Sequence, residues 1–370
     1  MDIARLKSSF AKVAMHGDEV PLHFYSDLFL KHPETRDMFP VSMQAQRAHL
    51  VAALVTIVSS VDDVDTLTAF ARDLGRDHRK FGTLAEHYEA VGDSLLATFA
   101  YFCGDAWDAA LEADWKAAYE LVASIMVAAA RADEEHKPAY WTGTVVSRER
   151  KAFDISVLTV HPEPRLDYLP GQSVAIESPA RPRLWRYYSM ANAPRADGSL
   201  EFHIRLIDGG AVSMALTSRA AGRGELRIGP PVGSLRLDPA SGREILMVAG
   251  STGLAPLKAM IEQLAGFPRP PAVHLFFGAR TADGLYDLPG LEKFAAEHRW
   301  VTVVPVVSSE RSGGRTGTLT DTVMRSGTWS AHDAYIAGPT EMVQDSAARL
   351  AAAGLPAAQI HVEDFGWSEQ

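Results

Sequence analysis

The sequence contains a single cysteine, Cys103, among its 370 residues. One cysteine cannot form an internal disulfide or hold a cluster through several thiolates, and this usage is typical of the reducing cytoplasm. No apolar run approaches the roughly 18 residues that a membrane-spanning helix requires. The first residues, Met1 to Arg5, lack the apolar stretch of a signal peptide. These absences predict a cytoplasmic chain without integral membrane association.

Basic residues are also fewer than acidic ones. Lysine and arginine together number 36, against 46 aspartate and glutamate residues, and the formal net charge is −10. A surface that binds nucleic acid normally carries a basic excess, so we do not expect nucleic acid as a partner. The hydrophobic content of 47% is that of an ordinary globular protein. A chain of this length is expected to fold as two or three domains.

Three segments differ in the period of their apolar residues. Residues 1–133 repeat them at helical spacing and predict an all-α domain. A polar linker is expected over residues 134–141, and residues 142–238 then show short alternating runs separated by turns, which predict an antiparallel β-barrel. In residues 239–370, continuous apolar runs alternate with helical patterns, which predicts an α/β domain with a parallel sheet.

The clearest chemical motif is Arg186-Tyr187-Tyr188-Ser189, which follows a candidate strand of the barrel segment. A flavin dinucleotide needs an apolar ring partner, a hydroxyl near its reactive nitrogen and positive charge at its pyrophosphate. Tyr188 is suited to stack on the flavin, Ser189 to hydrogen-bond to it and Arg186 to pair its phosphates. The motif alone would also fit an ordinary amphipathic strand. The turns that surround it, rich in glycine and proline, favour a flavin site.

A glycine turn follows later in the same segment. Gly210 precedes Ala211, Val212 and Ser213, where we expect a helix to begin. The free backbone N–H groups at a helix N-terminus suit an anion such as a phosphate. We therefore expect these four residues to take part in binding the flavin dinucleotide.

Glycine-rich loops follow the apolar runs of the last segment. The run Gly250-Ser251-Thr252-Gly253 lies between a predicted strand and a predicted helix, where the backbone can approach a pyrophosphate. Two further loops end later strands. All three lie at the carboxyl ends of parallel strands, where open α/β sheets bind ligands. The residues predicted to bind the nicotinamide nucleotide are Gly250, Thr252, Gly253, Arg280, Gly338 and Pro339.

Together these motifs resemble the ferredoxin–NADP reductase superfamily, in which an FAD-binding barrel precedes a pyridine-nucleotide domain. Ala337 stands where that family often has a cysteine, and the missing thiol is expected to slow hydride transfer. Near the C-terminus, Asp364-Phe365-Gly366-Trp367 looks like the segment that places an aromatic ring against the flavin. Phe365 is the expected ring, although an aromatic residue that merely packs at a chain end would give the same sequence pattern.

The choice between the two nicotinamide cofactors depends on the stretch after the strand that would present the adenine ribose. Glu310 would favour a free 2′-hydroxyl and hence NADH, whereas Arg311 could pair the 2′-phosphate of NADPH. The sequence does not settle which side chain points inward. We expect NAD(P)H as the electron donor, with NADH favoured.

The helical segment carries a second family pattern. Its pieces, which closely resemble the globin domain of bacterial flavohaemoglobins, are Phe24-Tyr25-Ser26-Asp27-Leu28-Phe29, Lys31-His32-Pro33-Glu34, Met38-Phe39-Pro40, Gln46-Arg47, His78 and Tyr88. The resemblance implies haem b, with His78 as the proximal iron ligand and Phe39 against the porphyrin. It also implies that Tyr25, Gln46 and Leu50 line the distal face of the haem. Taken singly, a histidine in a helical domain is usually a surface or packing residue.

One part of the globin pattern is incomplete. In this family a tyrosine and a glutamate commonly bond the proximal histidine and raise its electron donation. Tyr88 matches the tyrosine, but counting from Trp115 along the last helix places Ala130 at the glutamate position. The acids that would compensate only after a register shift are Glu120, Glu134 and Glu135. A less anionic proximal ligand is expected to slow dioxygen activation or raise the haem potential.

The resemblance implies a nitric oxide dioxygenase that takes electrons from NAD(P)H through FAD to haem and oxidises NO to nitrate with O2. Flavin is needed because hydride carries two electrons and iron accepts one at a time. Two other hypotheses stay open. In one, the globin is a gas sensor that regulates the reductase. In the other, the reductase serves a separate oxygenase, quinones or other small molecules. The oligomeric state is not predicted.

Overall fold

The structure is a computed structural model that describes residues 1–218, 224–238, 240–308 and 318–365. The chain forms two compact units, Met1–Tyr140 and Trp141–Gln370. We call them the helical unit and the two-sheet unit and describe each by itself. The domain limits expected from the sequence remain predictions. No helix in the described part of the chain is long and apolar enough to cross a membrane.

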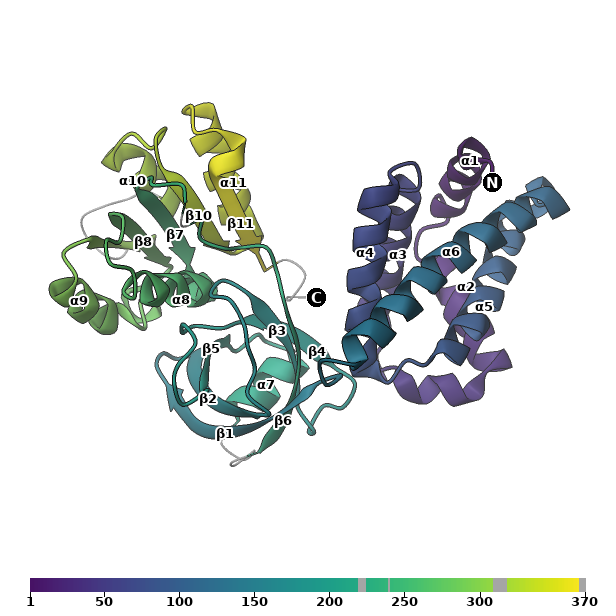
Figure 1. The fold of residues 1–370 in the computed structure, drawn as a ribbon, viewed down its shortest axis with the longest axis horizontal. Coiled ribbons are helices and arrows are strands. Elements are labelled where there is room, and N and C mark those ends of the chain that lie inside the picture. The colour runs from purple at the N-terminus through teal and green to yellow at the C-terminus, as the bar shows by residue number, and fades with distance from the viewer. Residues whose placement is uncertain (219–223, 239, 309–317, 366–370) are drawn as a thin grey trace. The chain divides into compact units, whose positions relative to one another are not determined.

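The helical unit confirms the expected all-α domain (Figure 1). Aspartates begin several of its helices: Asp63 accepts a hydrogen bond from the backbone of Thr66, and Asp108 caps the last helix in the same way. Two apolar clusters fill the interior, one around α2 and α5 and the other between α4 and α6. The helices are α1 (Ile3–Ala14), α2 (Glu19–Lys31), α3 (Gln44–Ser59), α4 (Val64–His78), α5 (Ala85–Cys103) and α6 (Ala109–Glu134), with short 3-10 turns η1 (Pro33–Met38), η2 (Arg79–Phe81) and η3 (Gly104–Ala106).

Helices α4 and α6 cross at very close range. A Cβ atom added to Gly75 would lie 2.3 Å from the backbone oxygen of Met126, so only glycine fits at this crossing. The contact fixes the end of α4, which carries His78, against α6.

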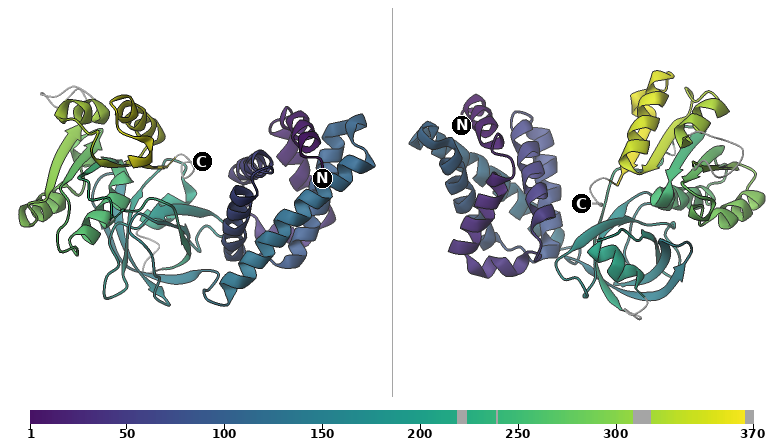
Figure 2. Two further views of the ribbon diagram at one scale, coloured as in Figure 1. Left: turned by 45° about the horizontal axis from the view of Figure 1, so that its top comes forward. Right: turned by 180° about the vertical axis from the view of Figure 1, so that it is seen from behind.

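The first half of the two-sheet unit is the expected antiparallel barrel. Its six strands run in the order β4-β3-β6-β1-β2-β5. An isolated bridge between Met190 and Phe202 connects the two outer strands. Helix α7 (Ala211–Thr217) packs on the barrel and adds Val212 and Leu216 to its core (Figure 1 and Figure 2). The strands are β1 (Trp141–Arg150), β2 (Ile155–Glu163), β3 (Ser173–Glu177), β4 (Trp185–Ser189), β5 (Leu200–Arg205) and β6 (Glu225–Val232).

The second half confirms the expected α/β fold with a parallel sheet. Its strand order is β11-β10-β7-β8-β9, and β7 and β10 are buried along their whole length, which explains their continuous apolar runs. Helices α8 and α9 cover one face of the sheet, and α10 and α11 cover the other. The elements are β7 (Ile245–Gly250), η5 (Ser251–Gly253), α8 (Leu254–Leu264), β8 (Val273–Ala279), η6 (Ala282–Gly284), α9 (Leu288–Glu297), β9 (Val301–Val307), α10 (Leu319–Ser326), β10 (Asp333–Gly338), α11 (Thr340–Ala352), η7 (Ala357–Gln359) and β11 (Ile360–Asp364).

Candidate functional site

Tyr25, the expected distal tyrosine, lies on α2 inside the helical unit and is 6% exposed. Its ring meets Phe39 edge to face, with the ring centroids 5.4 Å apart, and the ring of Phe29 lies 5.8 Å away. Burial raises the pKa of the Tyr25 hydroxyl, and a side-chain hydrogen bond with Gln46 opposes that rise. The hydroxyl therefore stays protonated and able to donate a hydrogen bond.

The remaining residues of the expected distal face lie on α3, and Phe39, expected against the porphyrin, directly follows η1. Gln46 and Leu50 are four residues apart on α3, so they share one face of the helix. Leu50 and Phe39 both pack against the apolar cluster that contains Tyr25. The structure thus places Leu50, and Phe39, which the resemblance assigns to the porphyrin, beside Tyr25, with Gln46 on the same helix face as Leu50.

His78, the expected iron ligand, is the last residue of α4. Its Nδ1 lies 2.7 Å from the backbone oxygen of Leu74 and donates a hydrogen bond to it. That bond assigns the proton to Nδ1 and leaves the lone pair of Nε2 for a metal. Burial lowers the pKa of His78, which also favours the neutral imidazole that iron needs. The donor set therefore fits an axial haem ligand.

The expected support for the proximal histidine is only partly present. Tyr88 and Leu74 pack on the same apolar cluster, which places Tyr88 near the end of α4, and burial raises the pKa of its hydroxyl. No hydrogen bond joins Tyr88 to His78 among the described residues. Ala130 on α6 carries no acid, as the sequence says.

The carboxylates near His78 form ion pairs with lysine and arginine. Asp77 pairs with Lys80 at 2.5 Å, and Asp133 pairs with Arg79. The acids considered as substitutes for the missing glutamate lie elsewhere: Glu120 pairs with Lys116 on the exposed side of α6, and Glu134 and Glu135 are exposed. The structure therefore offers no substitute for the missing glutamate within the described residues.

In the two-sheet unit, Ser189 makes the most informative contact of the flavin motif. Its Oγ donates a hydrogen bond to Oε1 of Glu363, at 3.0 Å. Glu363 is on β11, beside the carboxyl end of β10, where it pairs with Ala337. The contact thus joins the flavin motif of the barrel to the edge of the parallel sheet that carries the glycine loops.

The carboxyl of Glu363 is unusual in this position. Burial raises its pKa to about 7, partly opposed by the bond from Ser189. Its second oxygen, Oε2, is buried and has no hydrogen-bond partner among the described residues. An orphaned buried acceptor beside the flavin motif fits a polar ring edge such as that of a flavin. Sequence reasoning missed Glu363, although it directly precedes the quoted C-terminal segment.

The other residues of the motif alternate along β4. Tyr188 packs against the barrel core, and burial raises the pKa of its hydroxyl. Tyr187 is 39% exposed. Arg186 is half-buried, and its Nη1 donates to the backbone oxygen of Trp185 at 2.9 Å. Tyr188, on the core side, suits the role of a ring partner for the flavin. The half-buried guanidinium of Arg186, on the same strand, suits the role of a phosphate partner.

The expected helix start after the glycine turn is confirmed. Gly210 is the N-cap of α7, and Ala211, Val212 and Ser213 form its first turn. The hydroxyl of Ser213 donates to the backbone oxygen of Gly210 at 3.0 Å and accepts from the N–H of Ile207 at 3.2 Å. Ser213 therefore closes its own turn, and the backbone N–H groups rather than this hydroxyl remain for an anion.

Two of the nucleotide-loop glycines allow backbones to touch. A Cβ on Gly253 would lie 2.1 Å from the backbone oxygen of Ala337, and one on Gly338 would lie 2.8 Å from that of Gly250. Gly338 also has φ of +145°, which favours glycine. These residues bring the loops after β7 and β10 together at the carboxyl edge of the sheet. Their predicted contact with the nucleotide remains a prediction.

The other predicted residues surround the same edge. Thr252 is half-buried in η5, Pro339 caps α11, and Arg280 is exposed directly after β8. The N–H of Phe365 donates to the backbone oxygen of Gly338 at 3.2 Å, which fixes the C-terminal segment beside the loop. Glu310 and Arg311, on which the choice of nicotinamide cofactor depends, lie outside the described residues, as do Gly366 and Trp367.

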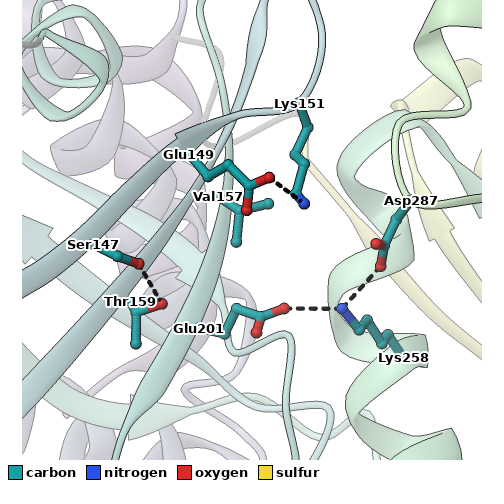
Figure 3. Close-up of a pocket in the computed structure, with 8 residues that line it drawn as sticks. All are labelled: Ser147, Glu149, Lys151, Val157, Thr159, Glu201, Lys258 and Asp287. Carbon is teal, nitrogen blue, oxygen red and sulfur yellow. Dashed lines mark hydrogen bonds and ion pairs between the residues drawn. The ribbon is translucent and has the colours of Figure 1, made fainter. Parts of the chain in front are cut away.

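A polar pocket of about 160 Å³ lies between barrel strands, the middle of α8 and the residue that caps α9 (Figure 3). The ammonium of Lys258 lies 2.9 Å from Glu201 and 2.8 Å from Asp287, and so links the barrel to the parallel-sheet domain. The pocket is lined by Ser147, Glu149, Lys151, Val157, Thr159, Glu201, Lys258 and Asp287. No motif in the sequence identified these residues.

Their charges stabilise one another. Burial opposes ionisation of Glu201, but the hydrogen bond from His203 and the ammonium of Lys258 outweigh it and lower the pKa of the carboxyl. The pKa of Lys258 is raised, since Glu201 and Asp287 together outweigh its burial. His203 also lies 2.7 Å from the hydroxyl of Tyr286, across the same boundary. The network fixes the barrel against the nucleotide-binding fold.

Comparisons with known proteins agree with this organisation. Residues 22–126 match the globin family, residues 142–237 the oxidoreductase FAD-binding domain and residues 247–348 the oxidoreductase NAD-binding domain. The flavohemoprotein of Bordetella pertussis is 28% identical over 393 residues, which cover 98% of this chain and 97% of that protein.

Two further similarities concern the whole fold and its second half. A flavohemoglobin crystal structure from Malassezia yamatoensis, with bound FAD and heme, has a TM-score of 0.79 at 19% identity and covers 98% of this chain and 99% of its own. The xylene/toluene monooxygenase electron transfer component XylA of Pseudomonas putida is 32% identical over 232 residues, 60% of this chain and 65% of that protein. The chain therefore has the domain organisation of the flavohaemoglobins, a globin domain followed by an FAD-binding and an NAD-binding domain, and is an NAD(P)H-dependent oxidoreductase.

Proposed function

We propose that this protein is a nitric oxide dioxygenase that converts NO and O2 to nitrate with electrons from NAD(P)H. Bound haem and FAD would supply the redox chemistry, and the flavin would divide a two-electron hydride into single electrons. The observation that carries the proposal is the buried Tyr25 hydroxyl, hydrogen-bonded to Gln46, in the same helical unit as a histidine whose Nε2 is free for iron.

The residues of the helical unit have separate tasks in this proposal. His78 holds the iron through Nε2 while Leu74 keeps the ring in one tautomer. Tyr25 donates a hydrogen bond toward the gas ligand, and Gln46 orients the Tyr25 hydroxyl. Phe39 and Leu50 exclude water, which strengthens the hydrogen bond of Tyr25. Tyr88 supports the proximal side by packing rather than through a charged relay.

The residues of the two-sheet unit bind and orient the two dinucleotides. Tyr188 supplies the ring partner of the flavin, Ser189 and Glu363 border its reactive edge, and Arg186 and the start of α7 hold its phosphates. The loops that contain Gly250, Gly253 and Gly338 receive the nicotinamide dinucleotide, for which we favour NADH. Phe365, which follows β11, would place its ring against the flavin.

One experiment tests the proposal directly. The purified protein is scanned from 300 to 700 nm, about the range of flavin and haem absorption, before and after anaerobic NADH, and then given O2 and NO in sequence. We expect a Soret band, bleaching of the flavin, a ferrous haem spectrum, and nitrate formed in proportion to NADH oxidised. Haem reduction without NO-dependent nitrate formation would refute the dioxygenase assignment.

A second candidate is an NAD(P)H-dependent flavin reductase that passes electrons to another acceptor, with a globin tuned to sense gas. Two observations favour it: the 32% identity of the second half to an oxygenase electron transfer component, and Ala130 at the position expected for the proximal glutamate. Rapid NADH oxidation with quinones or a partner oxygenase, together with slow NO turnover, would support this candidate over the first.

A further inference from the structure

Three side chains that commonly bind metals gather at the amino-terminal edge of the parallel sheet. Glu244 directly precedes β7, His332 directly precedes β10, and His274 is the second residue of β8. Because β7 lies between β10 and β8, the three residues come from adjacent strands. The backbone holds two of them side by side, since the N–H of Asp333 donates to the backbone oxygen of Glu244 at 3.0 Å. This edge is opposite to the one with the glycine loops.

The distances between the donor atoms suit one small ion. One donor atom from each residue lies within 4.8 Å of the other two. Oε2 of Glu244 is 3.3 Å from Nε2 of His332 and 3.9 Å from Nε2 of His274. Ligands of a tetrahedral zinc ion, each about 2.0–2.2 Å from the metal, lie roughly 3.3–3.6 Å from one another. The donor atoms of the two histidines lie within 4.8 Å of each other, so a side-chain movement of about 1 Å at His274 would complete the set.

His332 has a hydrogen-bonding deficit that an ion would relieve. Both of its ring nitrogens are buried, and neither has a hydrogen-bond partner among the described residues. Its Nε2 approaches Glu244 at an ion-pair distance without hydrogen-bond geometry. Buried polar nitrogens without partners are rare because they lose their hydration without replacement. A cation bound to Nε2 would supply the missing partner at that atom.

The two imidazoles are held in place by an aromatic neighbour. The ring of Trp329 meets both edge to face, with centroids 4.9 Å from His332 and 5.5 Å from His274. Trp329 is itself fixed, because its Nε1 donates to the backbone oxygen of Val323 at 2.9 Å. Because these rings are already held in place, metal binding costs less conformational entropy.

The local charge also favours a cation. Within the described ranges, Glu244 makes no ion pair with a lysine or an arginine. The nearby guanidinium of Arg243 is engaged by Asp333 at 2.9 Å instead. The carboxylate of Glu244 is therefore left to the two histidines, which are neutral when they act as ligands. Its side chain is 58% exposed, so water can enter and complete the coordination.

We propose that Glu244, His274 and His332 form a binding site for a divalent transition-metal ion, with Zn²⁺ as the best fit. Two imidazoles and one carboxylate are ligands that zinc accepts, with a fourth position for water. The bound ion joins the starts of β7, β8 and β10 and stabilises the nucleotide-binding fold through its binding free energy. The site is separate from the haem and flavin residues and does not depend on the proposed function.

The test uses tag-free holoprotein, because an added histidine tag would bind zinc itself. The protein is treated with a chelator, dialysed against micromolar ZnCl2, and its zinc and iron are measured together by mass spectrometry. We expect one zinc ion per chain. His332→Ala and His274→Ala should each weaken binding by more than about 100-fold, and Glu244→Gln by about tenfold. His136→Ala, which removes an exposed histidine of the helical unit, serves as the control and should bind like the wild type.

The stability of the fold gives a second measurement. Zinc should raise the melting temperature of the wild type and of His136→Ala by more than that of Glu244→Gln, whose affinity for zinc is about tenfold lower. Glu244 is exposed, so its substitution leaves packing intact even if a histidine variant fails to fold. Wild-type protein that binds no zinc at micromolar concentration, or Glu244→Gln that binds and melts like the wild type, would overturn the proposal.

Discussion

The proposed haem-pocket side chains of the helical unit and the Glu201–Lys258 pair of the two-sheet unit are held in opposite electrostatic states. In the helical unit, burial raises the pKa of Tyr25 and of Tyr88 and lowers that of His78, so all three side chains are neutral. In the two-sheet unit, Glu201 and Lys258 are shifted toward their charged forms and pair with each other.

This difference follows from what each unit has to position. Neutral donors in an apolar interior suit small uncharged ligands such as O2 and NO, because a fixed charge would hold water in the pocket. Ion pairs across a domain boundary instead fix the angle between two dinucleotide-binding folds, on which close approach for hydride transfer depends. Four predictions test this contrast, from the largest expected effect to the smallest.

The largest effect is expected for His78→Ala. Loss of the only proposed iron ligand should remove the Soret band and lower NO-dependent nitrate formation by more than about 100-fold, because second-shell changes alone reach that size at metal sites. NADH should still reduce the flavin at the wild-type rate, since the two-sheet unit is unchanged. His136→Ala is the matched control. A haem spectrum that persists in His78→Ala would show that another side chain binds the iron.

Lys258→Met should destabilise the two-sheet unit by about 3 kcal/mol, because it removes a cation shared by two largely buried carboxylates: Asp287 keeps no other cation among the described residues, and Glu201 keeps only Arg195. The matched control is Lys151→Met, which lines the same pocket but pairs with the 65% exposed Glu149. It should change stability by less than about 1 kcal/mol. Urea denaturation followed by flavin fluorescence measures both. Equal losses in the two variants would mean that the buried network does not stabilise the domain boundary.

Tyr25→Phe keeps the ring that packs on Phe39 and removes only the hydroxyl. Loss of one hydrogen-bond donor in a buried site should lower NO turnover by about 100-fold, or about 2.7 kcal/mol, while haem content stays the same. Tyr101→Phe, at a 67% exposed position of the same unit, is the control. Stopped-flow mixing of O2-loaded protein with NO measures the rate. An unchanged rate would leave Tyr25 as a packing residue only.

The sequence predicted the local features of this fold and missed the contacts between distant segments. The helix start after Gly210 and the apolar runs of β7 and β10 have a local pattern, so their elements were predicted correctly. Gly253 was predicted as a cofactor residue, and the structure adds that its lack of a side chain lets the backbone meet Ala337.

The missed residues share one property. Glu201 and Lys258 lie in different folds, and Ser189 and Glu363 are almost half the chain apart. No local sequence pattern therefore predicts either contact. Burial and pairing depend on which strands become neighbours, and a single sequence does not give that order. The flavin motif could be recognised from its own residues, whereas its partner on β11 required the fold.

The smallest effect is expected for Ser189→Ala, which tests the role of Glu363 beside the proposed flavin motif. Glu363 has its pKa raised to about 7 by burial, and the bond from Ser189 opposes the rise. The carboxyl is neutral below that pH and charged above it. Because hydride transfer adds negative charge to the ring beside it, the rate should fall as the pH rises through about 7.

Without the serine hydroxyl, the pKa of Glu363 should rise, so the fall should begin at a higher pH than in the wild type. The loss of one hydrogen bond should also slow hydride transfer by less than about tenfold. Ser147→Ala, in which the lost bond is to Thr159 far from the motif, should keep the wild-type profile. Stopped-flow flavin reduction by NADH between about pH 5 and 9, on either side of the pKa, measures both effects. A profile that stays in place in Ser189→Ala would show that Glu363 does not control the pH dependence of hydride transfer.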